Sequence, residues 1–204
     1  MELVSEAIAF AVKAHDGMRR KKSNAPYILH PMEAAVIVGT MTDDQNLIAA
    51  AALHDVVEDA GITIEEIEER FGKRVRELVQ SETEDKRADL PPADTWRIRK
   101  EESLEVLKNT NDIGVLMVWI GDKLSNIRSI AYDYRNIGDE LWKRFNAPKE
   151  KQAWYYSGIQ DSIFDMQLNS DCAEAYWEFV GLYKDVFVKY YLDTSNMDID
   201  EISK

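Results

Sequence analysis

Residues 47–59 read Leu-Ile-Ala-Ala-Ala-Ala-Leu-His-Asp-Val-Val-Glu-Asp. Their apolar positions recur at intervals of three and four, the spacing that places side chains on one face of an α-helix. Asp43 and Asp44 precede this run as a helix start, and Gly61 follows it as a helix stop. The pattern therefore predicts a helix from about residue 43 to about residue 61, with its apolar face turned to a core.

Two ionisable residues, His54 and Asp55, lie inside this apolar run. Such side chains are costly in a core unless they are exposed, paired or bound to a ligand. On a helix, Glu58 lies one turn beyond His54, and Asp59 lies one turn beyond Asp55. The segment therefore gathers one imidazole and three carboxylates within little more than one turn, either as a buried hydrogen-bonded cluster or as a chemical site.

Helical periodicity continues along the chain and predicts an all-α fold, a single-domain bundle of roughly eight to ten helices. After a first helix that ends at the basic stretch from Arg19, the helices are expected over residues 31–39, 43–61, 63–72, 95–109, 112–131, 139–145, 148–168 and 172–192. Residues 85–94 contain two adjacent prolines and are expected to form a loop. The predicted domain spans residues 1–192, and the acidic residues 193–204 are expected to form a flexible tail.

Composition excludes several classes of protein. The 204 residues carry 25 Lys and Arg against 38 Asp and Glu, a net charge of −13. This surplus argues against a nucleic-acid partner, which needs a basic face. No apolar run approaches the ~20 residues that span a bilayer, so no membrane partner is expected. The single Cys172 excludes an intramolecular disulfide, and the expected location is cytoplasmic.

Two further polar features lie outside the first segment. His30 precedes Pro31, which favours an extended backbone at a helix entrance. Asp122, Asn126 and Ser129 follow one another at steps of four and three, so they share one face of a predicted helix. Each feature alone also has a structural interpretation, as scaffold, as a buried pair or as a cap.

Taken together, these residues resemble the HD-domain metal phosphohydrolases, in which a His, a His-Asp pair and a distant Asp ligate one divalent metal ion. Four blocks narrow the resemblance to the hydrolase domain of RelA/SpoT-type (p)ppGpp enzymes: residues 15–22, 26–31, 52–59 and 121–129. The resemblance covers roughly residues 3–135. Because the chain leaves no room for the synthetase and regulatory domains of long members, it is expected to be a stand-alone small alarmone hydrolase, similar to the SpoT homologues of metazoa.

The resemblance implies a metal centre and a reaction. The implied metal ligands are His30, His54, Asp55 and Asp122. This set of two nitrogens and two carboxylates suits a divalent ion, and the family implies one Mn²⁺. The implied reaction is hydrolysis of the 3′-pyrophosphate ester of (p)ppGpp, which leaves GDP or GTP and pyrophosphate. The expected partner is thus a small-molecule nucleotide.

The resemblance also implies catalytic and substrate-binding residues. Glu58 would orient or deprotonate the attacking water, with Asp59 supporting it. Asn126 would contact the ribose or the bridging phosphate, and Ser129 would contact the nucleotide on the same helix face.

The basic run at residues 19–22 would attract a polyanionic substrate to this acidic chain. Family members carry an Arg-Lys pair here that contacts the base and phosphates. Counted forward from the first helix, the pair is Arg20-Lys21, whereas counted back from His30 it is Lys21-Lys22. We favour Arg20-Lys21 because loops absorb insertions more readily than helices. Ser23 belongs to the same predicted substrate-binding segment, and a solvated helix end is the structural alternative.

Other interpretations use the same residues. The same metal centre would serve a phosphohydrolase acting on (p)ppApp or NADPH, because only the base and ribose pocket would differ. A catalytically inactive nucleotide-binding module is the alternative outside the enzymes. The aromatic triplet at residues 154–156 would either stack on a base or belong to the core.

Overall fold

The computed structural model describes residues 2–20, 24–87 and 89–188. These residues form helices and contain no β-strand, so the all-α prediction is confirmed. The α-helices are α1 (Leu3–Ala14), α2 (Leu29–Met41), α3 (Gln45–Leu53), α4 (Val56–Ala60), α5 (Ile64–Phe71), α6 (Lys73–Glu82), α7 (Pro92–Asn109), α8 (Ile113–Ile137), α9 (Lys149–Ser162) and α10 (Ala173–Tyr183). Two 3₁₀ turns, Gly138–Arg144 and Phe164–Leu168, and a π-helical turn, Lys184–Val188, complete the described elements.

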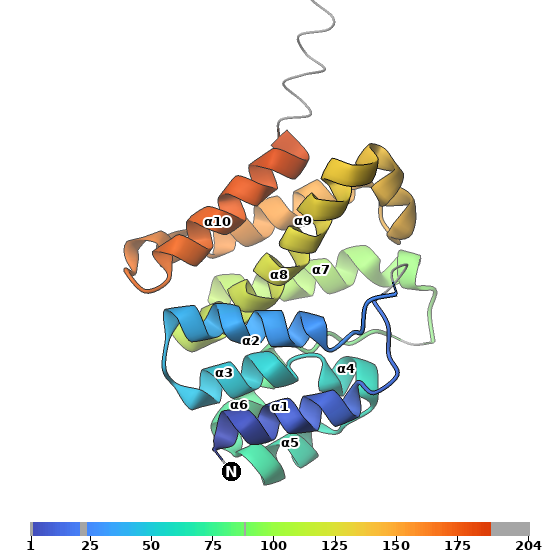
Figure 1. Cartoon of the computed structure of the whole chain (residues 1–204). Helices are drawn as coiled ribbons and strands as arrows, with labels where there is room; N and C mark the ends of the chain where they lie inside the picture. Colours follow the sequence, from blue (N-terminus) through green and yellow to red (C-terminus); the bar gives the residue numbers. More distant parts are fainter. Residues whose placement is uncertain (1, 21–23, 88, 189–204) are drawn as a thin grey trace, which may run out of the picture.

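Helix α2 lies at the centre of the arrangement (Figure 1). It packs against α3 on one side and against α8 on the other. Helices α1 and α6 also contact α3, while α10 packs against α8. The start of α2, the end of α3 and the middle of α8 are thereby brought together, although they are far apart in the sequence.

A glycine allows α2 and α8 to approach closely. A Cβ atom added at Gly121 would lie 2.7 Å from Val38 Cγ2 and 3.0 Å from the carbonyl oxygen of Ala34. Real Cβ atoms essentially never come as close to another atom as 2.7 Å. Gly121 directly precedes Asp122, so this contact fixes where Asp122 stands relative to α2.

The predicted helix over residues 43–61 is divided in two. Helix α3 ends at Leu53, His54 and Asp55 form a turn, and α4 begins at Val56. The His54 ring nitrogen Nδ1 lies 2.7 Å from the Ala51 carbonyl oxygen. In a continuous helix, that carbonyl would accept the amide of residue 55. The side chain of His54 therefore competes with the helical ladder at this point.

Helix α6 was not among the predicted helices, and the predicted helix over residues 139–145 is a 3₁₀ helix. The other differences concern where helices begin, end or are interrupted. Helix α7 begins at Pro92, a residue that suits the first helical position because it has no amide proton to satisfy. The predicted helix over residues 148–168 is interrupted after Ser162 by a 3₁₀ turn. The end of the predicted helix 172–192, the domain boundary at residue 192 and the tail 193–204 lie outside the described residues. None of the helices in the described ranges has the length and apolar character needed to cross a bilayer.

Asp112 holds the start of α8. Its side chain accepts a hydrogen bond of 2.9 Å from the Gly114 amide, and Arg74 of α6 donates two hydrogen bonds to it, of 2.6 and 2.9 Å. The Arg74 hydrogen bond lowers the pKa of Asp112 below its usual 3.8, with a smaller contribution from the Gly114 amide. The ion pair thus links α6 to α8.

We expect Arg74→Gln to lower the free energy of unfolding by about 0.5 kcal/mol near pH 7, because the pair is more than one third exposed and solvent screens it. The pKa of Asp112 is lower in the folded chain, so the pair stabilises the fold above pH 3.8. The difference between variant and wild type should shrink as the pH falls below 3.8. Urea unfolding at several pH values measures it, and a difference that grows on acidification contradicts the assignment.

Candidate metal centre

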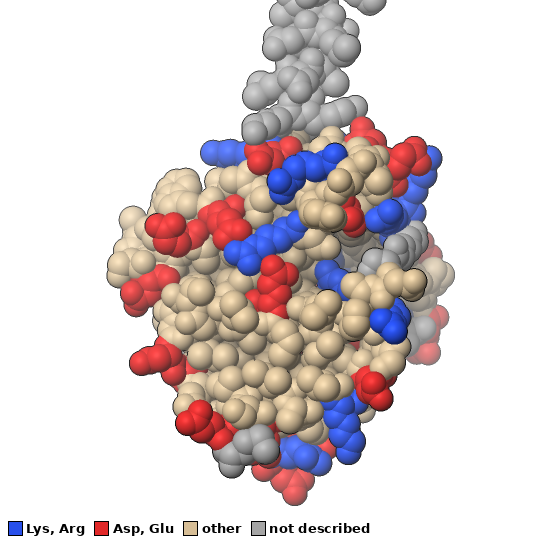
Figure 2. All heavy atoms as spheres, in the orientation of Figure 1, with Lys and Arg blue, Asp and Glu red and all other residues tan. Residues whose placement is uncertain are grey.

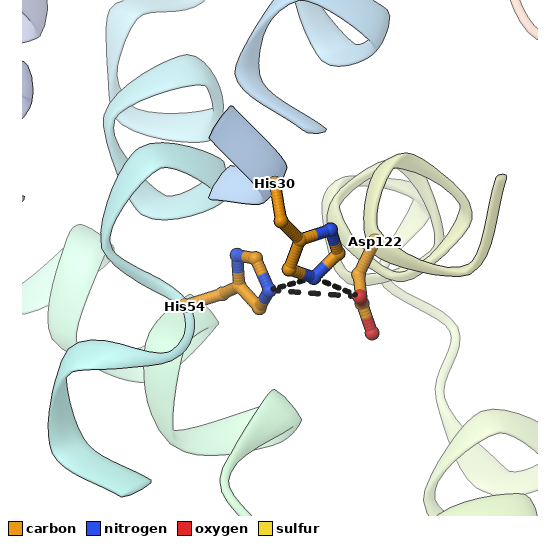
Figure 3. A group of neighbouring side chains, drawn as sticks. All are labelled: His30, His54 and Asp122. Carbon is orange, nitrogen blue, oxygen red and sulfur yellow. Dashed lines mark hydrogen bonds and ion pairs between the residues drawn. The ribbon is translucent and has the colours of Figure 1, made fainter. Parts of the chain in front are cut away.

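Three buried side chains from separate segments of the chain point toward one another (Figure 3). His30 is the second residue of α2, His54 follows α3, and Asp122 lies in the third turn of α8. One possible ligand atom from each lies within 4.8 Å of the other two, so the three residues form a group that could hold a metal ion.

The distances within this group are short. His30 Nε2 lies 3.3 Å from His54 Nε2 and 3.0 Å from Asp122 Oδ1. His54 Nε2 lies 3.6 Å from Asp122 Oδ1. Asp55 Oδ2 is 3.1 Å from His54 Nε2 and 3.5 Å from His30 Nε2. The fold therefore brings together all four residues that the sequence marked as ligands.

The hydrogen bonds behind the two imidazoles fix where their protons lie. The Ala51 carbonyl oxygen can only accept, so Nδ1 of His54 carries a proton, and in the neutral ring the lone pair lies at Nε2. Ser125 Oγ donates its proton to Glu33 Oε2 at 2.8 Å. It therefore accepts a hydrogen bond of 2.8 Å from His30 Nδ1, and the lone pair of His30 also lies at Nε2.

When both imidazoles are neutral, four acceptor atoms face one another at the centre. Burial lowers the pKa of His54, but the Asp55 and Asp122 carboxylates outweigh burial and raise it well above 6.5. Without a metal ion, His54 therefore holds a second proton on Nε2, which a bound cation would displace. Burial raises the pKa of Asp122, but the Lys123 ammonium and the two imidazoles hold it well below 3.8. The carboxylates are thus anionic, and the cluster attracts a cation. Two imidazole nitrogens with two carboxylates fit a borderline divalent metal ion.

Lys123 contacts Asp122 and also lies close to Glu82. The Lys123 ammonium contacts Asp122 Oδ2 and lies 3.5 Å from Glu82 Oε2. Glu82 is a buried residue, and its Oε1 has no hydrogen-bond partner among the described residues. The sequence analysis did not identify Glu82, because nothing in the periodicity of α6 predicts that its last residue faces α8.

Tyr27 connects Asp55 to Asp59, which is a second interaction that the sequence did not indicate. The Tyr27 hydroxyl lies 2.7 Å from Asp55 Oδ2 and 2.7 Å from Asp59 Oδ2. Burial and the two carboxylates raise the pKa of Tyr27, so the hydroxyl keeps its single proton and donates it to one or the other of these oxygens. Asp59 also pairs with the Lys86 ammonium. These contacts hold Asp55 with its Oδ2 toward the imidazoles.

Glu58 lies on α4, beside the turn that carries the His-Asp pair. Its Oε1 accepts a hydrogen bond of 2.5 Å from the Glu84 amide, and its Oε2 lies 3.4 Å from Lys86 Nζ. Burial raises the pKa of Glu58, and the Glu84 amide partly opposes this. A carboxylate with a raised pKa, next to a candidate metal centre, is suited to accept a proton from water.

A cavity of about 580 Å³ opens onto this centre. Its described lining includes several residues that the sequence predicted for catalysis or substrate binding: Arg20, Glu58, Asp59, Asn126 and Ser129. Arg20 Nη2 donates to Asn126 Oδ1 at 3.2 Å, and Asn126 Nδ2 donates to Asp122 Oδ1 at 2.6 Å. The predicted residues Lys21, Lys22 and Ser23 lie outside the described residues.

The charge of this cavity is nearly balanced. Its described lining holds six basic and eight acidic side chains. The face drawn in Figure 2 likewise mixes coloured basic and acidic side chains and has a broad uncharged area below them. The ratio of basic to acidic side chains in the lining is close to that of the whole chain, which has 25 basic and 38 acidic residues.

The aromatic triplet at residues 154–156 is divided between two environments. Tyr155 and Tyr156 are buried and line the cavity. The ring of Tyr156 also stacks on Phe179 and Phe187 within the core. Trp154 is not among the cavity residues, and the Arg97 guanidinium lies 3.3 Å from the centre of its ring.

Comparisons with known proteins agree with this arrangement. A guanosine-3′,5′-bis(diphosphate) 3′-pyrophosphohydrolase of Aquifex aeolicus is 33% identical over 202 residues, which cover 98% of this chain and 27% of that protein. A GTP pyrophosphokinase of Brucella ovis is 34% identical over 129 residues, covering 63% of this chain and 17% of that protein. The chain thus spans about a quarter or less of the length of these curated relatives.

Two solved structures are similar in fold. One is a metazoan ortholog of SpoT described as hydrolysing ppGpp, with a TM-score of 0.69, 24% identity and coverage of 90% of this chain and 95% of that one. The other is a protein of Listeria monocytogenes EGD-e, with a TM-score of 0.68, 30% identity and coverage of 78% and 98%. The HD domain family matches residues 7–145, which include every residue of the candidate centre. The chain therefore belongs to the HD domain family.

Proposed function

We propose that this chain is a Mn²⁺-dependent hydrolase that removes the 3′-pyrophosphate of (p)ppGpp. The observation that carries the proposal is the convergence of His30 Nε2, His54 Nε2, Asp55 Oδ2 and Asp122 Oδ1 at the wall of a cavity that Glu58, Asn126 and Arg20 line. The names of the Aquifex relative and of the metazoan structure support the choice of substrate.

The chemistry requires water to attack the phosphorus atom next to the ribose 3′ oxygen. A divalent ion at the four ligands would polarise the phosphoryl group and lower the pKa of a water molecule. Glu58 accepts a proton from the attacking water, and its raised pKa makes the carboxylate a stronger base than an ordinary glutamate. The new oxygen–phosphorus bond replaces the bond to the 3′ oxygen, which takes a proton from solvent, and Glu58 returns its proton to solvent. The products are GDP or GTP and pyrophosphate.

The other cavity residues bind and orient the nucleotide. Asn126 lies between Asp122 and Arg20, to which it is hydrogen-bonded, and so faces the position next to the metal centre. Arg20 offers a planar guanidinium that pairs with a phosphate or stacks on a base. Ser129 lies one turn beyond Asn126 on the same face of α8. Together they would place the ribose 3′ ester beside the metal ligands.

The substrate is tested by comparing turnover of ppGpp, ppApp and NADPH by one metal-free preparation of the chain, with added Mn²⁺ or with a chelator. We expect release of pyrophosphate and GDP from ppGpp with Mn²⁺, no release with the chelator, and the highest kcat/KM for ppGpp. Cleavage of ppApp or NADPH alone would assign the metal centre to another nucleotide. Binding of ppGpp without release of pyrophosphate would identify an inactive binding module.

A further inference from the structure

A series of hydrogen bonds leads from the metal centre to a distant helix. His30 Nδ1 donates to Ser125 Oγ at 2.8 Å, and Ser125 Oγ donates to Glu33 Oε2 at 2.8 Å. Arg128 Nη1 donates to Glu33 Oε1 at 3.1 Å. Arg128 also donates two hydrogen bonds of 2.7 Å to the carboxylate of Glu178 on α10. The series therefore joins α2, α8 and α10.

We propose that Ser125 and Glu33 are positioning residues that set the metal affinity of the centre. They hold His30 in the tautomer whose Nε2 lone pair faces the other ligands. The inference rests on the metal centre of the proposed function, and it adds residues that neither the ligand set nor the catalytic residues include.

The direction of the Ser125 hydroxyl decides the tautomer. A hydroxyl has one proton, so it can donate to Glu33 or to His30 Nδ1, but not to both. If it donated to His30, the imidazole would carry its own proton on Nε2. That proton would point at His54 and Asp122 and would occupy the place of a cation. Glu33 prevents this because its carboxylate can only accept the hydroxyl proton.

Burial of Ser125 lets Glu33 determine the direction of the Ser125 hydroxyl, and thus the tautomer of His30. Ser125 is 1% exposed, so no solvent molecule competes for its hydroxyl. The Glu33 side chain is 39% exposed and would otherwise sample several rotamers. Arg128, itself tied to Glu178, holds Glu33 in the orientation that receives the proton. Ion pairs exposed to this degree stabilise a fold little, so the expected effect of Glu33 is on metal binding.

The test is calorimetric titration of the metal-free full chain with Mn²⁺ at constant pH. We expect Ser125→Ala to weaken binding by about 10- to 100-fold, as is usual when a group that orients a metal ligand is removed. The matched control is Ser162→Ala in α9, where the serine hydroxyl donates only to the Gly158 carbonyl in its own helix. Its affinity should equal that of the wild type.

Two variants of Glu33 separate the tautomer effect from packing. Glu33→Ala removes the acceptor and should weaken Mn²⁺ binding, whereas Glu33→Gln keeps an acceptor oxygen and should retain most of the affinity. Wild-type affinity in both Ser125→Ala and Glu33→Ala overturns this inference while leaving the metal centre intact. Absence of Mn²⁺ binding in the wild-type chain overturns the proposed metal centre, and this inference with it.

Discussion

His54→Ala should abolish metal binding and hydrolysis together. The variant removes one of two imidazole nitrogens, and it also leaves Asp55 and Asp122 facing each other across a space without the positive partner that His54 provides. Metal affinity should fall by more than the ~100-fold that loss of an orienting group costs. Elemental analysis after dialysis and pyrophosphate release from ppGpp measure the two losses on the same sample.

The matched control is His15→Ala. His15 is also a buried histidine, and its ring lies 5.0 Å from that of Tyr27, but it contacts none of the four proposed ligands directly. This variant should keep its metal, which separates the loss of a ligand from the loss of a buried imidazole. Full metal content in His54→Ala, with folding verified by circular dichroism, would exclude His54 from the metal centre.

Glu58→Ala should keep the metal and lower kcat by about 100- to 10,000-fold, the usual contribution of a general base. Among the described residues, the Glu58 carboxylate is hydrogen-bonded to the Glu84 amide and paired with Lys86, and neither of these is a proposed metal ligand. Single-turnover measurements with ppGpp, together with metal content, distinguish a slow chemical step from a missing metal ion.

Glu58→Gln separates the proton-accepting role from the structural one. The amide oxygen of glutamine can still accept the hydrogen bond from Glu84, so the chain after α6 should stay in place, but glutamine cannot take a proton from water. We therefore expect the Gln variant to be nearly as slow as the Ala variant. Near-normal turnover in Glu58→Gln would mean that Glu58 only holds this segment, and loss of metal would mean that it supports a ligand.

Local patterns predicted most of the helices, though not α6, and the clustering of polar residues around His54. Thr63, for example, caps α5 through the Glu66 amide, as the spacing of these two residues predicts. The break after Leu53 could not be predicted in this way, because it depends on a side chain that competes with an amide for one carbonyl. Periodicity indicates only which face of a segment is apolar. A continuous helix and a helix broken after Leu53 have the same apolar face.

Contacts between helices were beyond the reach of the sequence pattern. Tyr27 meets Asp59 across 32 positions, and Ser125 meets Glu33 across 92. Both pairs depend on how α2 and the residues just before it pack against other helices. The sequence of a single segment does not determine this packing. The resemblance to HD-domain hydrolases named the four ligands because it carries long-range information, but it did not name the partners that orient them.

Because Gly121 has no side chain, α8 approaches the backbone of α2 closely at this position, and Asp122 is the next residue. Repacking of side chains elsewhere along α2 and α8 can therefore proceed without moving the aspartate away from His30. A methyl group at residue 121 would instead push α8 away from α2, so that one added carbon atom would change the distance between Asp122 and His30.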